Sequence, residues 1–273
     1  MSPDTLAALA ELLARGGRGA LATVIRTGGS TPQIAGARLL LRPDGSLVGT
    51  VGGGAIEHAV VEALRVCRES GRPEILVKDL ARDLGMCCGG RMEVFVEPIE
   101  GTPRLVVFGA GHVGAAVAKL AKELSFRVVV VDAREELNDE ARFPGCERAL
   151  FEPREIAGML ATTEHDHLLV TTHDHRLDEE ALDTFARLPH RYLGLIGSKR
   201  KILRILERIE MRGALPPLDR VYAPVGLDLG AVTPEEIAVS IVAELVALRH
   251  GKPGRHLRCL DDPAFARFKR STE

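Results

Sequence analysis

The stretch over residues 104–132 constrains the fold of this chain more than any other. It places three glycines, Gly109, Gly111 and Gly114, at the spacing G-x-G-x-x-G. A short apolar run at 105–108 precedes them and an alanine-rich pattern of helical period follows. A buried strand, a glycine turn and a helix in this order are typical of a dinucleotide-binding fold. Gly109 would make the tight turn, Gly111 would let the backbone approach a pyrophosphate, and Gly114 would let the helix lie close to the sheet.

A phosphate at this turn would lie on the N-terminus of the helix, where unpaired N–H groups and the helix dipole favour anions. The next apolar run, 127–131, ends in Asp132. This is about 20 residues beyond the glycines, where such folds place the carboxylate that binds the ribose hydroxyls. His112 lies inside the turn and can face a ligand or solvent. The alternative is a tight crossover without a ligand, in which Asp132 only caps the next helix.

Composition points to an ordinary soluble protein. The 273 residues allow one large domain or two moderate ones, and hydrophobic (45%) and charged (27%) contents are unexceptional. A net charge of −2 gives no support for a nucleic-acid or membrane-surface role. We find no long apolar span and no leader pattern, so we expect a cytoplasmic protein. The five cysteines include no C-x-x-C pair, which suits a reducing compartment and disfavours a structural zinc site.

We predict an α/β protein with an N-terminal α/β domain followed by a Rossmann-like domain, a doubly wound parallel sheet. The first would cover residues 1–101, the second 102–255, and a C-terminal tail 256–273. The expected elements of the first domain are a helix at 3–15, strands at 19–26, 37–42, 47–51, 74–78 and 92–97, and a helix from about 55 to 67. In the second domain we expect helices at 135–141 and 153–160 and a strand at 167–172. The apolar helix expected at 234–249 packs in the core or forms a dimer contact, and we prefer the core.

A second glycine cluster, Gly52, Gly53 and Gly54, lies between a predicted strand and a predicted helix. The backbone N–H groups of such a turn can wrap an anion. An irregular turn without a ligand is an equally good interpretation.

Two adjacent cysteines, Cys87 and Cys88, lie in a glycine-flanked loop next to Arg91. Neighbouring side chains of a strand point to opposite faces, but a loop can present one or both sulfurs to a ligand, and the arginine would favour a thiolate. Two small buried hydrophobic side chains are the alternative, which the residues alone favour.

The predicted strand at 167–172 runs into His173, Asp174 and His175. Loops at the carboxyl ends of parallel strands form the binding crevice in such folds, so these residues are candidates for a ligand or metal site. Spacing supplies no third metal ligand, so we prefer capping of the next helix or contact with a substrate.

A basic helix start follows the next predicted strand. Gly197 and Ser198 precede Lys199 and Arg200, and Ser198 is a natural N-cap. Cations in a first turn oppose the helix dipole, which makes sense if an anion binds there. A solvated basic face is the alternative.

Several blocks of this sequence, taken in order, carry a family resemblance. They cover residues 29–32, 36–38, 49–54 with Glu57, 85–90, 108–114, 172–175, 194–198 and 224–228. Together they resemble the XdhC/CoxI family, accessory proteins of xanthine dehydrogenase and related molybdenum hydroxylases. The resemblance extends from about residue 20 to 250.

This resemblance implies a maturation chaperone rather than a dehydrogenase. Such a protein would bind the molybdenum cofactor, an anionic pterin (molybdopterin) that carries a phosphate and exists also as a dinucleotide. It would protect the cofactor while a cysteine desulfurase supplies the sulfido ligand, and deliver it to the hydroxylase. Arg38, Lys199 and Arg200 are plausible counter-charges, and Cys87 or Cys88 would lie near molybdenum or carry sulfur. We also expect a homodimer.

The alternative function is that of an NAD(P)-dependent oxidoreductase acting on a small carbonyl or alcohol. Asp132 would then bind the ribose, and His173 or His175 would act as the acid–base group near the nicotinamide. An ordinary dehydrogenase has no need of a second anion cradle and a Cys-Cys loop, which favours the chaperone.

Overall fold

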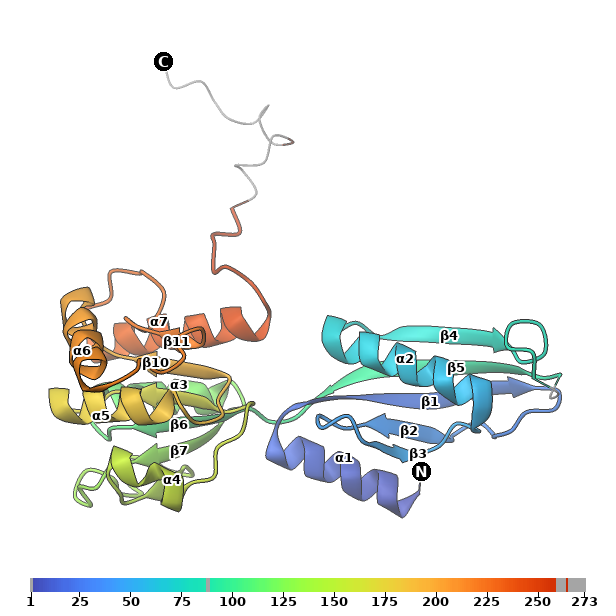
Figure 1. Cartoon of the computed structure of the whole chain (residues 1–273), viewed down its shortest axis with the longest axis horizontal. Coiled ribbons are helices and arrows are strands. Elements are labelled where there is room, and N and C mark those ends of the chain that lie inside the picture. The colour runs from blue at the N-terminus through green and yellow to red at the C-terminus, as the bar shows by residue number, and fades with distance from the viewer. Residues whose placement is uncertain (1, 87–88, 259–263, 265–273) are drawn as a thin grey trace.

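The computed structural model describes residues 2–86, 89–258 and 264. Two β-sheets follow one another along the chain, joined by a short linker between Glu100 and Arg104 (Figure 1). None of the described helices has the length and apolar character needed to cross a bilayer.

The first sheet is antiparallel throughout, in the order β3-β2-β1-β5-β4. Its strands are β1 (Arg18–Gly28), β2 (Arg38–Leu41), β3 (Leu47–Gly49), β4 (Glu74–Asp79) and β5 (Arg91–Glu100). The helices α1 (Pro3–Arg15) and α2 (Gly54–Ser70) accompany it. The predicted elements of this region are confirmed, with ends that shift by a few residues.

Each face of the first sheet is covered by one helix. On one face, Ile56 and Leu64 of α2 pack with Val24 and Val94 of the sheet. On the other, Leu12 of α1 packs with residues of β1 and β2. Because side chains alternate along a strand, β1 supplies both cores and is buried over most of its first half.

The second sheet is parallel throughout, in the order β11-β10-β9-β6-β7-β8. Its strands are β6 (Arg104–Phe108), β7 (Arg127–Val131), β8 (Glu147–Ala149), β9 (His167–Val170), β10 (Tyr192–Leu195) and β11 (Val221–Tyr222). The helical segments are α3 (His112–Glu123), η1 (Pro153–Glu155), α4 (Ile156–Met159), α5 (His175–Phe185), α6 (Lys199–Arg212) and α7 (Pro234–Arg249). The strand order reverses between β6 and β9, which is the position of the binding crevice in doubly wound folds.

Helices cover both faces of the second sheet, which confirms the predicted fold class. The helices α3 and α7 pack on one face, and α4, α5 and α6 on the other. Ile241 and Leu245 of α7 are fully buried in the first of these cores. The preferred interpretation of α7 as a core helix is therefore confirmed.

The prediction of a helix at 135–141 is wrong, because this segment forms a series of turns. The side chain of Asn138 is buried and donates hydrogen bonds to the carbonyl oxygens of Val130 (3.2 Å) and Ala149 (2.9 Å). A carboxylate oxygen of Asp139 accepts from the backbone N–H of Arg142 at 2.8 Å. The Asn138 side chain is thereby tied to two strands outside the segment. Asp139 takes the Arg142 N–H that a helix would direct to a carbonyl oxygen, which is how aspartate favours turns.

Candidate functional site

The glycine turn after β6 is tightly packed on one side. A side chain at Gly109 would collide with the carbonyl group of Thr171, and one at Gly114 would collide with the carbonyl oxygen of Gly109. The Thr171 hydroxyl donates to the carbonyl oxygens of Phe108 and Gly109, each at 3.3 Å. The turn therefore lies directly against the end of β9. The loop that carries His173, Asp174 and His175, here called the histidine loop, begins at this point.

The same turn is open on its other side. A Cβ at Gly111 would meet no atom of the described chain within 4 Å, and the φ of −72° at this residue suits any amino acid. Gly111 is the N-cap of α3, and within the described part of the chain no side chain caps this helix. The first turn has no acidic residue, and His112 is exposed. The N-terminus of α3 thus presents unpaired N–H groups to open space, which suits an anion.

Asp132 is engaged by the protein itself. Its Oδ2 accepts from the backbone N–H of Ala110 at 2.8 Å, and the guanidinium of Arg134 binds both carboxylate oxygens. Burial opposes ionisation of Asp132, but the hydrogen bonds from Arg134 and Ala110 outweigh it and hold the pKa of this carboxyl below its usual value. The carboxylate oxygens expected to bind a ribose are therefore already partnered.

Little enclosed space remains beside Asp132. A cavity of about 30 Å³ lies between the ends of β6, β7 and β9, lined by Arg134, Thr172 and His173 among others. This volume is far below the ~300 Å³ at which small-molecule pockets begin.

The histidine loop is exposed and its aspartate caps a helix. A carboxylate oxygen of Asp174 accepts from the backbone N–H groups of Arg176 (2.6 Å) and Leu177 (3.4 Å), as expected for the N-cap of α5. His173 and His175 are exposed. The described residues contain no group of three or more metal-ligating side chains. The predicted capping of the next helix is thus found at Asp174.

A buried ion pair that the sequence did not suggest lies behind this loop. Asp178 is 1% exposed and forms an ion pair with Lys201 of α6. The other carboxylate oxygen of Asp178 accepts from the Thr172 hydroxyl at 2.6 Å. In the sequence, Asp178 follows the predicted cap Asp174 by four residues, which is about one helical turn. This spacing is the sequence feature that could have indicated Asp178.

The start of α6 is basic and borders an open groove. Ser198 caps this helix through the backbone N–H of Lys201 (3.2 Å), as predicted, while Lys199 and Arg200 are exposed. Beside them lies a cavity of about 700 Å³, lined by residues of the β10–α6 turn, by His175 and by several cations of α6. Gly197 lies at its edge. This groove adjoins the carboxyl end of the sheet, as does the turn at Gly111.

In the first sheet, three glycine-rich loops converge. A Cβ at Gly52 would come within 2.6 Å of Pro32, and one at Gly54 would lie 3.8 Å from the methyl carbon of Met86. A Cβ at Gly29 would lie 3.3 Å from the α-carbon of Gly90. We call this group, residues 28–36, 50–57, 84–86 and 89–91, the N-terminal loop cluster. Cys87 and Cys88 belong to its third loop but lie outside the described residues.

The triple-glycine turn already holds a carboxylate of the chain. Glu57 accepts through one oxygen from the Thr50 hydroxyl (2.5 Å) and from the backbone N–H groups of Val51 and Gly53 (3.2 Å each). Burial opposes ionisation of Glu57, but these hydrogen bonds together lower its pKa. Arg38 is next to this turn, because its carbonyl oxygen accepts from the Thr50 N–H at 2.9 Å. The Val51 and Gly53 N–H groups and the Thr50 hydroxyl therefore hold the Glu57 carboxylate, while the Gly52 N–H donates to the Thr50 hydroxyl at 3.1 Å.

The N-terminal loop cluster and the crevice of the second sheet lie at opposite ends of the folded molecule (Figure 1). β5 runs from the loop cluster to the linker, and β6 continues from the linker toward Gly109. With 10 and 5 residues, and about 3.3 Å per residue, the two strands alone span about 50 Å. No small ligand can contact both sites within one chain.

Two family models match this chain. That of the XdhC Rossmann domain matches residues 105–245, and that of the XdhC and CoxI family matches residues 12–78. The crystal structure of a xanthine dehydrogenase from Bacillus halodurans has the same fold, with a TM-score of 0.52 and 23% identity over 96% of this chain and 99% of that one.

Two curated relatives are longer than this chain. It is 37% identical over 241 residues to "Uncharacterized protein YqeB" of Escherichia coli (strain K12). This alignment covers 86% of this chain and 44% of that protein. It is 35% identical over 157 residues to a Bacillus subtilis (strain 168) protein named as a probable xanthine dehydrogenase subunit, which covers 57% of this chain and 46% of that protein. The aligned part is thus less than half of each relative. Because the Rossmann-domain model alone spans more than half of the chain, and the second model accounts for β1 to β3 and α2, the chain belongs to the XdhC and CoxI family.

Proposed function

We propose that this protein is an accessory factor of a xanthine dehydrogenase-type molybdenum hydroxylase, with the molybdenum cofactor as its cargo. Family membership across both sheets supports the accessory role, and one relative is itself named as part of a xanthine dehydrogenase. The observation that carries the cargo assignment is the open, uncapped turn at Gly111. The open space at Gly111 supports the approach of a phosphate to the unpaired N–H groups of α3.

The surroundings of this turn support an anionic cargo larger than phosphate. Lys199 and Arg200 are exposed at the next helix start, beside the groove of about 700 Å³. Arginine and lysine there can balance the phosphate charge of molybdopterin or of its dinucleotide form. The phosphate would bind at α3, and the remainder of the cofactor would extend along the carboxyl edge of the sheet toward this groove.

We further propose that the N-terminal loop cluster serves sulfuration of the cargo. Its third loop carries Cys87 and Cys88, residue types that can accept sulfur from a cysteine desulfurase as a persulfide. Loss of sulfuration in Cys87→Ser or Cys88→Ser, with cofactor binding retained, is the expected result. Unchanged sulfuration in both variants would contradict this role.

We also propose a homodimer, and the separation of the two proposed sites supports it. About 50 Å of β-strand lies between them within one chain, so a cofactor bound at Gly111 can meet the loop cluster only of a second copy arranged head to tail. Sedimentation of the purified protein would show a dimer, and mixed dimers of Gly111→Ala with Cys87→Ser chains would regain sulfuration. A strictly monomeric protein with full sulfuration activity would contradict the arrangement.

Delivery can be tested by reconstitution. The protein, loaded with sulfurated cofactor, is mixed with an apo-hydroxylase under anaerobic conditions in the presence of a scavenger for free cofactor. We expect hydroxylase activity to appear with the loaded protein and not with an equal amount of free cofactor. Equal activation by free cofactor would contradict the accessory role.

The second candidate function, nicotinamide-dependent oxidoreduction, keeps one observation in its favour. The strand order of the second sheet is that of dinucleotide-binding domains, with Arg134 placed where it could accommodate a 2′-phosphate. Against it stand the engaged carboxylate of Asp132 and the small cavity beside it.

A further inference from the structure

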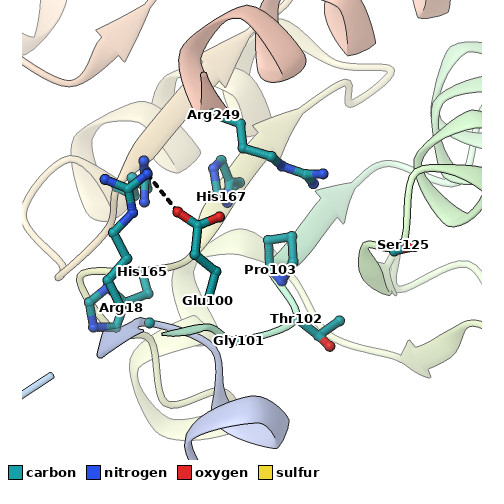
Figure 2. Close-up of a pocket in the computed structure, with 11 residues that line it drawn as sticks. Arg18, Glu100, Gly101, Thr102, Pro103, Ser125, His165, His167 and Arg249 are labelled. Atoms are coloured by element: carbon teal, nitrogen blue, oxygen red, sulfur yellow. Dashed lines mark ion pairs between the residues drawn. The ribbon is translucent and has the colours of Figure 1, made fainter. Parts of the chain in front are cut away.

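A second polar pocket lies at the junction of the two sheets, at the amino ends of the parallel strands. Its volume is about 280 Å³. Arg18 and Glu100 of the first sheet, His167 of β9 and Arg249 of α7 line it, as Figure 2 shows, and so does Arg191, which directly precedes β10. It is remote from the turn at Gly111, which lies at the carboxyl end of β6. The pocket therefore belongs neither to the proposed cofactor site nor to the N-terminal loop cluster.

The charges around this pocket do not balance. Three guanidinium groups line it against one carboxylate, Glu100, which is already paired with Arg18 at 2.7 Å (Figure 2). The neighbouring Asp166 is not free to compensate, because it binds Arg104 through two hydrogen bonds of 2.8 and 2.5 Å. The pocket thus retains a net charge of two positive units, carried by Arg191 and Arg249.

These two arginines lie close enough to repel one another. The guanidinium of Arg191 has neither a hydrogen bond nor an ion pair with any residue that the structure describes. Burial lowers its pKa, and the charges of Arg18 and Arg249 lower it further. Two half-buried cations without a counter-ion are costly, and a bound anion would remove this cost.

Two nitrogen atoms in the wall lack partners. One terminal nitrogen of Arg249 is buried and donates to no polar group of the described chain, although the guanidinium is held in place over the Phe126 ring at 4.4 Å. The Nδ1 of His167, a residue 5% exposed, is likewise buried without a partner among the described residues. Buried polar atoms are nearly always hydrogen-bonded, so these two nitrogens call for a partner outside the chain, which is a bound ligand or an ordered water.

We propose that this junction pocket binds a small dianion of the phosphate type, such as inorganic phosphate or a compact phosphate monoester. Two guanidinium groups without a carboxylate partner match two negative charges, and their planar forks suit phosphate oxygens. The volume lies just below the ~300–1,000 Å³ of pockets for drug-sized ligands, which suits a compact molecule. Because the walls come from both sheets, the anion would hold them together across the linker at 101–103.

The test is titration of the full chain with sodium phosphate, followed by calorimetry and by thermal unfolding, against sodium chloride at matched ionic strength. We expect phosphate to raise the melting temperature beyond the effect of chloride. Arg191→Gln and Arg249→Gln should each weaken phosphate binding about tenfold or more. Without phosphate, Arg191→Gln should not melt at a lower temperature than the wild type, because it relieves repulsion without removing a hydrogen bond, whereas Arg249→Gln also loses its contacts with Leu124 and Phe126.

Three controls keep the result specific. Arg154→Gln removes an exposed arginine outside the pocket and should leave phosphate binding unchanged. Gly111→Ala should also leave it unchanged, which separates this site from the proposed cofactor site. Arg191→Lys keeps the charge and should retain part of the affinity. Comparison with glycerol 3-phosphate distinguishes a site for free phosphate from one for an ester.

The proposal is overturned if phosphate stabilises the protein no more than chloride does. It is also overturned if Arg154→Gln weakens binding as much as the pocket variants, or if only Gly111→Ala abolishes it. None of these measurements involves the molybdenum cofactor, so they stand apart from the proposed function.

Discussion

The guanidinium of Arg134 binds both carboxylate oxygens of Asp132, through Nε at 2.9 Å and a terminal nitrogen at 2.7 Å. The same carboxylate accepts the backbone N–H of Ala110 at 2.8 Å. Asp132 therefore ties the end of β7 to the glycine turn. The carboxylate thus supports the turn, and a contact of Asp132 with a ribose stays a prediction.

Replacement of Asp132 by alanine should therefore destabilise the protein. The side chain is 7% exposed, and its removal leaves the Ala110 N–H and the Arg134 guanidinium without their partner, at a cost of about 2–3 kcal/mol. Arg134→Ala should cost less, because the bond to Ala110 remains. Urea unfolding measures both free energies. An equal or greater loss in Arg134→Ala would contradict the supporting role of Asp132.

Substitution by alanine should affect stability differently at two glycines of the same turn. Gly114→Ala brings a methyl group into the carbonyl oxygen of Gly109 and should destabilise the protein by about 1–3 kcal/mol. Gly111→Ala places its methyl group in open space and should leave the unfolding free energy within about 0.5 kcal/mol of the wild type. Thermal and urea unfolding of the two variants decide this. If Gly111→Ala proves the more damaging of the two, the turn is not open as described.

The buried pair of Asp178 and Lys201 should be costly to break. Lys201→Met leaves an uncompensated carboxylate that is 1% exposed, for a loss of about 3–5 kcal/mol. The double variant Asp178→Asn with Lys201→Met should recover at least half of this, because asparagine retains a polar partner for Thr172. Arg65→Met, at an exposed pair with Glu62, is the matched control and should cost less than ~1 kcal/mol. A double variant no better than the single one would refute the explanation.

Acid should destabilise the protein through His167. Burial and the charge of Arg191 lower the pKa of His167 to about 4, whereas in the unfolded chain it is about 6.5. The unfolded state therefore binds the additional proton between these values, and the free energy of unfolding falls as the pH drops from 6.5 toward 4, by about 3 kcal/mol in all. In His167→Phe this contribution should vanish. Thermal melts across this pH range compare the variant with the wild type and with His58→Gln at an exposed position; equal slopes in all three would contradict the assignment.

Much of the second sheet could be predicted from local sequence alone. The strand, turn and helix around Gly109, and the caps Asp174 and Ser198, depend on residues close in the chain, and each is found as expected. The segment 135–141 shows the limit of this approach, because its helical period was overridden by the tertiary hydrogen bonds of Asn138.

The chemistry of the sites was harder to foresee. Arg134 binds the carboxylate of Asp132, which was expected to bind a ribose, and Glu57 binds the glycine turn that was expected to hold an anion. Both residues are near these groups in the sequence, yet nothing in the local sequence indicates these contacts. The junction pocket could not be predicted at all, because Arg18, Arg191 and Arg249 are brought together only by the packing of the two sheets. The role of Cys87 and Cys88 stays a prediction.

The proposed function requires that the turn at Gly111 bind the phosphate of the molybdenum cofactor. Anaerobic binding of the cofactor to the wild type and to Gly111→Ala would show this, with NADH and NADPH as competitors and with molybdenum content and absorbance as readouts. We expect stoichiometric retention by the wild type, little effect of either nicotinamide, and at least tenfold weaker retention by the folded Gly111→Ala protein. Absence of cofactor binding together with micromolar nicotinamide binding, or equal retention by both proteins, would contradict it.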